Sequence, residues 1–421
     1  MEKLIVKGGT RLEGTIPVSG CKNAVLPIAV AASILGDGAS VLHNVPNLTD
    51  VKTLRAVLEG LGATIKFKNS TLYIEPINHL EYEAPYDLVR KMRASIYVLG
   101  PLLAKLGKAK VSFPGGCAIG PRPIDLHIRG LEQLGAEVNV EKGYIFAQAE
   151  RLVGTEMNLV GQHGPSVGAT ANVMMAATLA QGTTVIRGAA REPHISDLAH
   201  FLNAMGADIE GIGTPTLTIR GVKQLRGTEH TVISDDIEAG TFIVAGAITR
   251  SDVYIKGITP KQIPAISEKL VEAGVELDWD ANGVRVTTPN GIQPINVTTA
   301  PFPGFPTDMQ AQIMGLLCLA FGTSVITENV HTDRFIHAAE LNRMGANIML
   351  DGSKAIIKGV PKLSGAPVMA SDLRAGAVLV AAGMAATGET AVSRVYHIDR
   401  GYESIEKKLN NVGANITRVN D

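Results

Sequence analysis

The residues best suited to chemistry are cations placed where buried helices are expected to begin. Six segments that are apolar on nearly every face start with SGCKNA, KMRASI, PSVGAT, DDIEAG, PTDMQA and SDLRAG. Helix N-termini carry roughly half a positive charge and free N–H groups, so several of them in one domain favour an anion. Formal cations stand at these starts or in nearby loops at Lys22, Arg93, Arg122, Arg334, Arg374 and Arg400. The pattern predicts an anionic substrate, although any single arginine could equally be a solvated or ion-paired surface group.

Cys117 lies in the loop FPGGCAIGPRPID, which is rich in glycine and proline. Such a loop is suited to closing over a ligand. Nearby Arg122 gives the thiol an environment that can shift its pKa. The alternative is an incidental loop cysteine. Cys318 lies in the apolar run IMGLLCLA and is expected to be core packing, while the role of Cys21 stays open.

Asp308 stands in FPGFPTDMQAQ, in the first turn of a predicted buried helix. The helix dipole alone favours an acid there, whereas a general base would need a substrate hydroxyl within hydrogen-bond reach. The sequence leaves both interpretations open. The histidines and cysteines show no metal-ligand spacing, and neither GxGxxG nor a P-loop occurs. We therefore expect no metal, nicotinamide cofactor or ATP.

These residues are positioned by a unit that recurs through the chain. A Leu-Gly-Ala-like tripeptide has its glycine at 62, 135, 206, 274, 345 and 413, with spacings of 73, 71, 68, 71 and 68. Six units of about 70 residues follow, each a buried helix, a strand, an amphipathic helix and two more strands. Each glycine is expected to end its amphipathic helix in the left-handed conformation. Residues 1–21 resemble the strand segment that precedes later buried helices and are expected to complete the last unit.

The predicted fold class is α/β, a two-domain inside-out α/β barrel with buried apolar helices and sheets outside. The three-repeat domains are 22–233, which carries the Cys117 loop, and the discontinuous 1–21 plus 234–421. We expect the active site in the cleft between them.

Composition narrows the function classes. The 421 residues include 39 Lys and Arg against 40 Asp and Glu, a net charge of −1. Nucleic-acid binding and membrane-surface anchoring both need an excess of cations, so neither is expected. The N-terminus lacks the apolar region of a secretory signal, and no apolar stretch suits a membrane span. Together with three cysteines that cannot all pair, these features predict a cytoplasmic protein.

Several motifs make the chain recognisable: SGCKNAVLP, KMRASI, PGGCAIGPRPIDLH, PSVGAT, AAREP, EAGTF, FPTDMQAQ, SDLRAGA and YHIDRGYE. They closely resemble the UDP-N-acetylglucosamine enolpyruvyl transferases (1-carboxyvinyltransferases) over essentially the whole chain. The related 5-enolpyruvylshikimate-3-phosphate synthases share the six-unit architecture without this cysteine loop. The resemblance implies transfer of the enolpyruvyl group of phosphoenolpyruvate to the 3′-hydroxyl of UDP-N-acetylglucosamine, with release of phosphate. This is the first committed step of peptidoglycan synthesis, and it proceeds by addition and elimination through a tetrahedral intermediate.

The resemblance also implies roles for individual residues. Cys117 would be the general acid that protonates C3 of phosphoenolpyruvate, and the thiol that the epoxide fosfomycin alkylates. Asp308 would deprotonate the attacking sugar hydroxyl. Lys22, Arg122 and Arg400 would hold the phosphate and carboxylate of phosphoenolpyruvate. Around the same cleft the resemblance implies three more cations, a ligand contact and an acid that steadies the cations: Arg93, Arg334, Arg374, Asn23 and Asp372.

For the nucleotide sugar the resemblance implies three segments. Arg122, Pro123, Ile124, Asp125 and Leu126 would lie against the uracil. Ser166, Val167 and Gly168 would bind the diphosphate, and Asp308 with Val330 would lie near the sugar. Three positions depart from the family pattern: Gly164, beside His163, replaces a lysine, His194 replaces a glutamate, and Asp236 replaces an arginine. These departures concern nucleotide-sugar binding more than the reaction.

Two other functions are open at this point. The first is an enolpyruvyl transferase of secondary metabolism that acts on another nucleotide, which the missing lysine favours. The second is a silent scaffold that binds a nucleotide sugar, which the presence of Cys117, Asp308 and the cations opposes.

Overall fold

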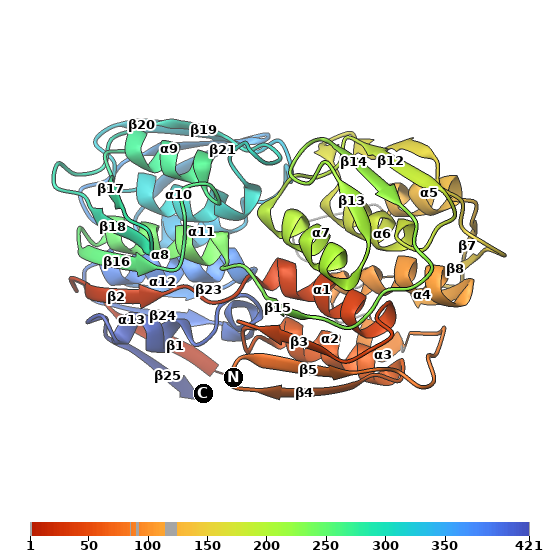
Figure 1. Cartoon of the computed structure of the whole chain (residues 1–421). Coiled ribbons are helices and arrows are strands. Elements are labelled where there is room, and N and C mark those ends of the chain that lie inside the picture. The colour runs from red at the N-terminus through yellow and green to blue at the C-terminus, as the bar shows by residue number, and fades with distance from the viewer. Residues whose placement is uncertain (1, 85, 90–91, 114–123, 421) are drawn as a thin grey trace. The chain divides into compact units, whose positions relative to one another are not determined.

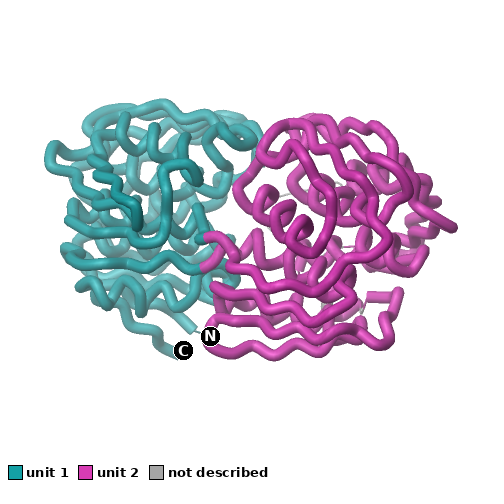
Figure 2. Tube along the Cα trace, viewed as in Figure 1, with its two compact units in different colours: residues 1–19, 118–120, 234–421 teal, residues 20–117, 121–233 magenta. Residues whose placement is uncertain are grey.

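The computed structural model describes residues 2–84, 86–89, 92–113 and 124–420 (Figure 1). Cys117, Arg122 and Pro123 lie outside the described residues. The chain divides into two compact units, which Figure 2 draws in two colours. Unit 1 comprises the described residues of 1–19 and 234–421, and unit 2 those of 20–117 and 121–233. Each unit has its own hydrophobic core.

Three apolar helices form the interior of unit 1 and pack against one another: α8 (Asp236–Ile248), α10 (Gln310–Leu317) and α12 (Leu373–Ala385). Nearly all of their residues are buried, which confirms the prediction made from their uniformly apolar sequences. The side chain of Asp235 caps α8, and that of Asp372 caps α12. Each accepts hydrogen bonds from backbone N–H groups in the first turn of its helix.

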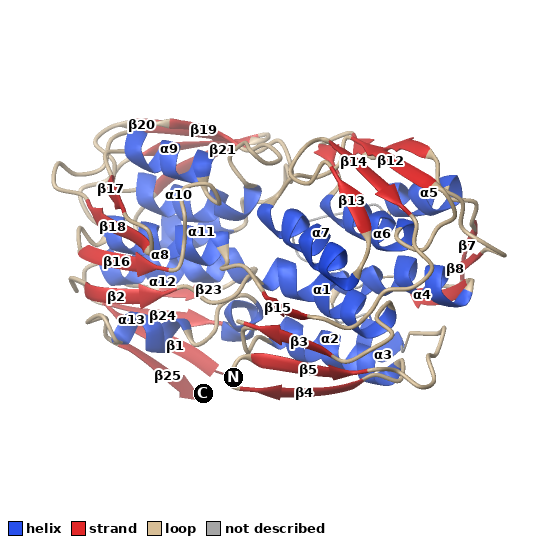
Figure 3. Ribbon diagram, viewed as in Figure 1, coloured by secondary structure: helices blue, strands red, loops and turns tan. Residues whose placement is uncertain are grey.

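Three four-stranded sheets cover these helices, and Figure 3 shows the strands on the outside. One sheet has the order β23 (Pro367–Met369), β24 (Glu389–Ser393), β1 (Glu2–Lys7) and β25 (Ile416–Asn420). The next has β17 (Glu276–Trp279), β18 (Gly283–Thr287), β16 (Asp252–Lys256) and β2 (Glu13–Pro17). The last has β19 (Asn296–Thr298), β20 (Thr323–Thr327), β22 (Lys354–Lys358) and β21 (Asn347–Asp351). The N-terminal strands β1 and β2 therefore complete two sheets of unit 1.

Unit 2 is built in the same way around α1 (Lys22–Ile34), α4 (Leu99–Leu106) and α6 (Val167–Ala177). One four-stranded sheet has the order β15 (Glu229–Thr231), β3 (Ser40–His43), β5 (Thr71–Glu75) and β4 (Thr64–Lys68). The other has the order β13 (Asp208–Glu210), β14 (Thr216–Arg220), β12 (Thr183–Arg187) and β9 (Glu156–Asn158). A three-stranded sheet contains β6 (Lys108–Ser112), β8 (Tyr144–Gln148) and β7 (Glu137–Glu141). A single bridge from Glu83 to Lys110 takes the place of its fourth strand, and β10 (Val160–Gly161) with β11 (Gly164–Pro165) forms a short hairpin.

The amphipathic helices end at glycines, as predicted. They are α2 (Thr49–Gly60), α5 (Asp125–Gln133), α7 (Pro193–Met205), α9 (Pro264–Glu272), α11 (His337–Arg343) and α13 (Ile405–Asn410). The glycines at 62, 135, 206, 274, 345 and 413 have φ of 106°, 95°, 107°, 87°, 90° and 100°. A side chain would be strained in this left-handed conformation, so the recurring glycine is a backbone requirement.

Two predicted helix starts differ from a plain α-helix. The segments at Arg93 and Thr307 begin as the 3₁₀ helices η1 (Arg93–Val98) and η2 (Thr307–Met309), which lead into α4 and α10. Bonds from residue i to i+3 tighten these ends and satisfy N–H groups that an α-helix start leaves free. The remaining short helices are α3 (Tyr86–Val89) and η3 (Val395–Arg400). No helix in the described part of the chain is long and apolar enough to cross a membrane.

Candidate active site

The described candidate residues fall into one set in each unit. Unit 1 carries Asp308, Val330, Arg334, Asp372, Arg374 and Arg400. Unit 2 carries Lys22, Asn23, Arg93, Ile124, Asp125, Leu126, Ser166, Val167 and Gly168. Within the described ranges, no group of three or more His, Cys, Asp or Glu residues is arranged to hold a metal ion.

Asp308 is the centre of the set in unit 1. Its Oδ1 accepts a hydrogen bond from Nη1 of Arg334 at 2.7 Å, and its Oδ2 accepts one from Nε of Arg374 at 3.2 Å. Both arginines are buried, whereas the Asp308 side chain is 30% exposed. Two guanidinium groups in a desolvated setting stabilise the ionised carboxylate. The structure therefore brings three predicted residues into one cluster. Of the three, Asp308 alone is accessible to solvent to a substantial degree.

Glu328 organises the loop beside this cluster. This fully buried side chain accepts hydrogen bonds from the hydroxyls of Thr299 and Thr307, at 2.7 and 2.9 Å. It also accepts the backbone N–H groups of Val330 and His331, each at 2.9 Å. The Thr307 hydroxyl in turn accepts from Nη1 of Arg334 at 3.3 Å. Glu328 therefore fixes both the Val330 backbone and a partner of Arg334, and sequence reasoning missed it.

A buried polar network supports Arg374 from its other side. The guanidinium carbon of Arg374 lies 5.3 Å from the ring centroid of Tyr402, a cation–π contact. The Tyr402 hydroxyl lies 2.9 Å from that of Thr241 and accepts from Nε2 of Gln312 at 3.1 Å. Burial raises the pKa of Tyr402, so its phenol is neutral at physiological pH. These contacts hold Arg374 in one orientation.

Asp372 lies beside Arg334, and Arg400 stands at the end of a short helix. Oδ1 of Asp372 is 3.9 Å from Nη2 of Arg334, and the same oxygen caps α12. His337 is buried beside them, and burial, with a smaller contribution from Arg334, lowers its pKa to about 4. It is therefore neutral at physiological pH. Arg400 ends η3 and is half-buried, and it contributes with burial to lowering the pKa of His397.

Two adjacent acids begin α8, where the family pattern has one acid and an arginine. Burial and the neighbouring Asp235 raise the pKa of Asp236 to about 8, although Arg374 acts in the opposite direction. Asp236 is therefore largely protonated at neutral pH. Glu238, two residues on, is buried and forms an ion pair of 2.8 Å with Lys408. The departure at Asp236 thus places a titrating carboxyl close to Arg374 and Asp308.

In unit 2, Lys22 begins α1 and pairs with Asp50 in the first turn of α2. Nζ of Lys22 lies 2.8 Å from Oδ2 of Asp50, and both side chains are at most 10% exposed. Asn23 follows on the same helix and is half-buried. The sequence identified Lys22 as a candidate but not its partner Asp50, because acidic residues are common in the first turn of a helix.

A second network lies under the predicted diphosphate segment. Oδ1 of Asn172 accepts the backbone N–H of Gly100 at 2.7 Å, which leaves its amide nitrogen to donate to Nδ1 of His127 at 3.1 Å. Because Nδ1 accepts, the proton of the neutral ring is on Nε2. Burial, aided by Arg93, lowers the pKa of His127 to about 3. A Cβ at Gly168 would lie 2.8 Å from Nε2 of His127, so this position needs glycine.

At the helix start above this histidine, no residue that the structure describes accepts the backbone N–H of Val167 or of Gly168. Ser166 caps α6, and its Oγ accepts the N–H of Ala169 at 3.3 Å. Ser166, Val167 and Gly168 are partly exposed. The arrangement is suited to an anion such as a phosphate.

The predicted uracil segment is only partly described. Ile124 occupies the N-cap position of α5 without a capping side-chain bond. The Asp125 side chain is exposed, and Leu126 is buried in the core of unit 2. Leu126 can therefore offer a ligand little more than its backbone.

One departure has a local structural reason. Gly164 has a φ of 98° at the β10–β11 hairpin, a conformation that a lysine side chain rarely adopts. His163 in the loop of that hairpin is exposed. His194 follows Pro193 in the first turn of α7 and is buried.

Comparisons with known proteins identify similar chains. Residues 6–409 match the family described as EPSP synthase (3-phosphoshikimate 1-carboxyvinyltransferase). The chain is 52% identical over 419 residues to the UDP-N-acetylglucosamine 1-carboxyvinyltransferase of Methylacidiphilum infernorum, covering 100% of this chain and 99% of the relative. It is 53% identical over 419 residues to that of Desulfatibacillum aliphaticivorans, covering 100% of both. The crystal structure of the enolpyruvyl transferase NikO from Streptomyces tendae is similar with a TM-score of 0.90 and 25% identity, covering 99% of both chains.

Proposed function

The chain belongs to the EPSP synthase (3-phosphoshikimate 1-carboxyvinyltransferase) family and is a transferase, and we propose its substrates and chemistry from that premise. It transfers the enolpyruvyl group of phosphoenolpyruvate to the 3′-hydroxyl of UDP-N-acetylglucosamine and releases phosphate. The acceptor is the one that the names of relatives more than 50% identical over the whole chain specify. This reaction begins peptidoglycan synthesis.

The proposed reaction has two steps. The sugar O3′ forms a bond to C2 of phosphoenolpyruvate while C3 gains a proton, which produces a tetrahedral intermediate. C3 then loses a proton, the bond between C2 and the phosphate oxygen breaks, and phosphate leaves. Cys117 donates the first proton, and Asp308 removes the proton of the sugar hydroxyl. Lys22, Arg122 and Arg400 hold the phosphate and carboxylate of phosphoenolpyruvate.

The observation that carries the proposal is the cluster around Asp308. The carboxylate is partly exposed and is held by two buried arginines that cannot lose their charge. Preorganised cations of this kind stabilise the negative charge that develops during addition and elimination. An acid that served only the helix dipole would need neither arginine.

Nucleotide-sugar binding is assigned to the residues that match the family pattern. Ser166, Val167 and Gly168 bind the diphosphate with the free N–H groups of α6, and Val330 lies near the sugar. The segment 122–126 lies against the uracil. Around the phosphoenolpyruvate we place the remaining members of the two sets: Asn23, Arg93, Arg334, Asp372 and Arg374.

The fold has a matching interpretation. We interpret the sheets and apolar helices as six repeats of an inside-out α/β barrel, in domains 22–233 and 1–21 plus 234–421. The interpretation is supported by the left-handed glycine that ends six amphipathic helices. Cysteines at 21, 117 and 318, with no pairing expected, suit a reducing cytoplasm.

Released phosphate tests the proposal. The protein is mixed with phosphoenolpyruvate and, in separate reactions, UDP-N-acetylglucosamine, UMP or no acceptor. Phosphate should appear with UDP-N-acetylglucosamine alone. Release with UMP instead would favour an enzyme of secondary metabolism, and nucleotide-sugar binding without release would indicate a silent scaffold.

A further inference from the structure

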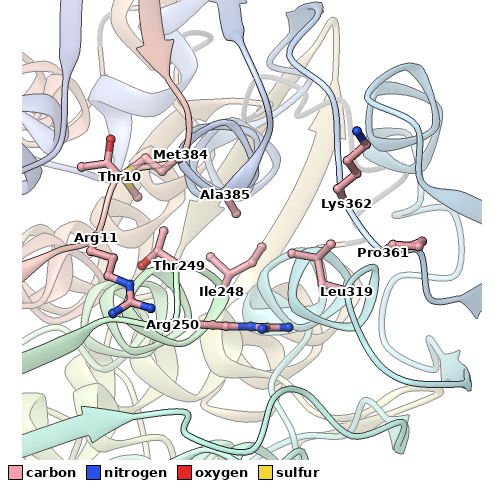
Figure 4. Close-up of a pocket in the computed structure, with 11 residues that line it drawn as sticks. Thr10, Arg11, Ile248, Thr249, Arg250, Leu319, Pro361, Lys362, Met384 and Ala385 are labelled. Carbon is pink, nitrogen blue, oxygen red and sulfur yellow. The ribbon is translucent and has the colours of Figure 1, made fainter.

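Unit 1 contains a pocket away from the Asp308 cluster. Its volume is about 300 Å³. It opens at the C-terminal ends of the three apolar helices, next to Ile248 of α8, Leu319 beyond α10 and Ala385 of α12 (Figure 4). Asp308 and Asp372 lie at the opposite, N-terminal ends of α10 and α12. A 13-residue helix such as α12 is roughly 20 Å long, so the pocket is not part of the Asp308 cluster.

The pocket is basic. Arg11, Arg250 and Lys362 line it from three separate parts of the sequence, and no acid does (Figure 4). None of the three cations forms an ion pair with a residue that the structure describes. Each helix C-terminus contributes roughly half a negative charge, about −1.5 for the three ends. Arg11, Arg250 and Lys362 are exposed. Their three positive charges exceed the charge of the helix ends, so an anion that enters the pocket meets a net positive charge.

The backbone at Arg250 is also unusual. Arg250 has a φ of 52°, in the left-handed region. Its N–H donates to the carbonyl of Ala247 and the N–H of Ser251 donates to that of Gly246, the pattern that ends a helix with a left-handed residue. Glycine is the usual residue at this position, and an arginine there is strained. The chain nevertheless has a long cation at this rim of the pocket.

Buried hydrogen bonds fix the residues next to both arginines. The Ser251 hydroxyl accepts the backbone N–H of Leu12 at 2.7 Å and lies 2.6 Å from the Thr249 hydroxyl. Thr249 and Ser251 flank Arg250, and Leu12 follows Arg11. The two arginines therefore extend from backbone segments that are tied together, so little backbone order has to be gained when a ligand binds.

We propose that this pocket binds a small soluble molecule that carries phosphate groups. Two guanidinium forks and an ammonium group match the several oxygens of a phosphate ester or diphosphate better than a single carboxylate. The volume suits a compact ligand rather than a polymer. The site is additional to the enolpyruvyl transfer site and uses none of its residues.

Pyrophosphate is the probe, and equilibrium dialysis counts the molecules bound per chain. Wild type is compared with the double variant Arg11→Gln, Lys362→Gln and with a control of equal charge change, Lys261→Gln, Lys354→Gln, on exposed lysines of the same unit. Pyrophosphate that binds at the Asp308 cluster is common to all three proteins. The pocket variant should bind one molecule fewer, or bind it about tenfold more weakly per cation removed, while the control matches wild type. Identical binding curves for all three would overturn the proposal.

Arg250→Gly separates a ligand-binding arginine from a structural one. The substitution removes the strain at φ 52°, so the melting temperature without anion should rise by a few degrees. The additional stabilisation by pyrophosphate should fall toward that of the double variant. A lower melting temperature with undiminished stabilisation by pyrophosphate would assign Arg250 to the fold and contradict the proposed site.

Discussion

The two carboxylate oxygens of Asp308 accept hydrogen bonds from two different buried guanidinium groups. Oδ1 lies 2.7 Å from Nη1 of Arg334, and Oδ2 lies 3.2 Å from Nε of Arg374. Both guanidinium groups favour the charged form of this carboxylate. If it accepts the proton of the sugar hydroxyl, one of these bonds has to loosen when substrate binds. Under the proposed role of Asp308, the two ion pairs are a resting arrangement that changes when substrate binds.

Asp308→Asn keeps the size of the side chain and removes both its charge and its basicity. We expect kcat to fall by about 10²- to 10⁴-fold, the usual contribution of a general base. Asp333→Asn, an exposed acid on the loop before Arg334, is the control and should keep wild-type activity. A kcat for Asp308→Asn within about threefold of wild type would remove the residue from the mechanism.

Glu328→Gln tests whether the buried acid positions the site. The carboxylate of Glu328 accepts hydrogen bonds from hydroxyl and N–H groups, and in the variant an amide nitrogen would face some of these donors. The lost hydrogen bonds should cost about 1–3 kcal/mol of stability. Because Glu328 fixes the Val330 backbone, KM for UDP-N-acetylglucosamine should rise more than KM for phosphoenolpyruvate. Glu389→Gln at an exposed strand start serves as the comparison. Equal changes in the two KM values would reduce Glu328 to a residue of general stability.

Asp236 predicts a pH effect on stability. Its pKa is about 8 in the folded protein against the ordinary 3.8, so between about pH 4 and 8 the folded state holds a proton that the unfolded state has released. The contribution of this group to stability therefore falls as pH rises through that range. Asp236→Asn cannot ionise and should gain stability relative to wild type between pH 5 and pH 8.5, measured by urea unfolding. A constant difference between the two proteins would show that Asp236 does not titrate in this range.

The sequence predicted the fold well at positions where the local backbone conformation or burial requires a particular type of residue. Gly62 and the five later glycines had to be left-handed, and the apolar helices could only be buried. The same signals located Lys22, Asp308 and Arg374 at helix starts. In each case the physical cause lies within one turn of helix.

The missed residues depend on partners far apart in the sequence. Glu328 binds the hydroxyl of Thr299, 29 residues away, and His127 binds Asn172, 45 residues away. The hydrophobic periodicity of the sequence indicates that a residue is buried, but it does not indicate which donor forms a hydrogen bond with that residue. The 3₁₀ start at Thr307 was missed for a similar reason, because a single turn adds no period to the pattern.

The proposed acid can be tested although Cys117 lies outside the described residues. Cys117→Ser replaces a thiol of ordinary pKa near 8.5 by a far weaker acid and should abolish or severely impair turnover. Cys117→Asp should retain activity, because a carboxylic acid can also donate the proton. Fosfomycin should label the wild-type thiol and leave the Asp variant unmodified. Wild-type turnover by Cys117→Ser, or an adduct on Cys21 in mass spectra, would assign the chemistry elsewhere.

The most direct test of the central claim is the structure of the product. The protein is incubated with phosphoenolpyruvate and UDP-N-acetylglucosamine, and the nucleotide product is analysed by mass spectrometry and by NMR of the sugar ring. We predict that one enolpyruvyl group is attached to O3′ for every phosphate released, and that an acceptor lacking the 3′-hydroxyl remains unchanged. Attachment at another oxygen, or an unmodified nucleotide sugar under conditions in which it binds, would contradict the proposed reaction.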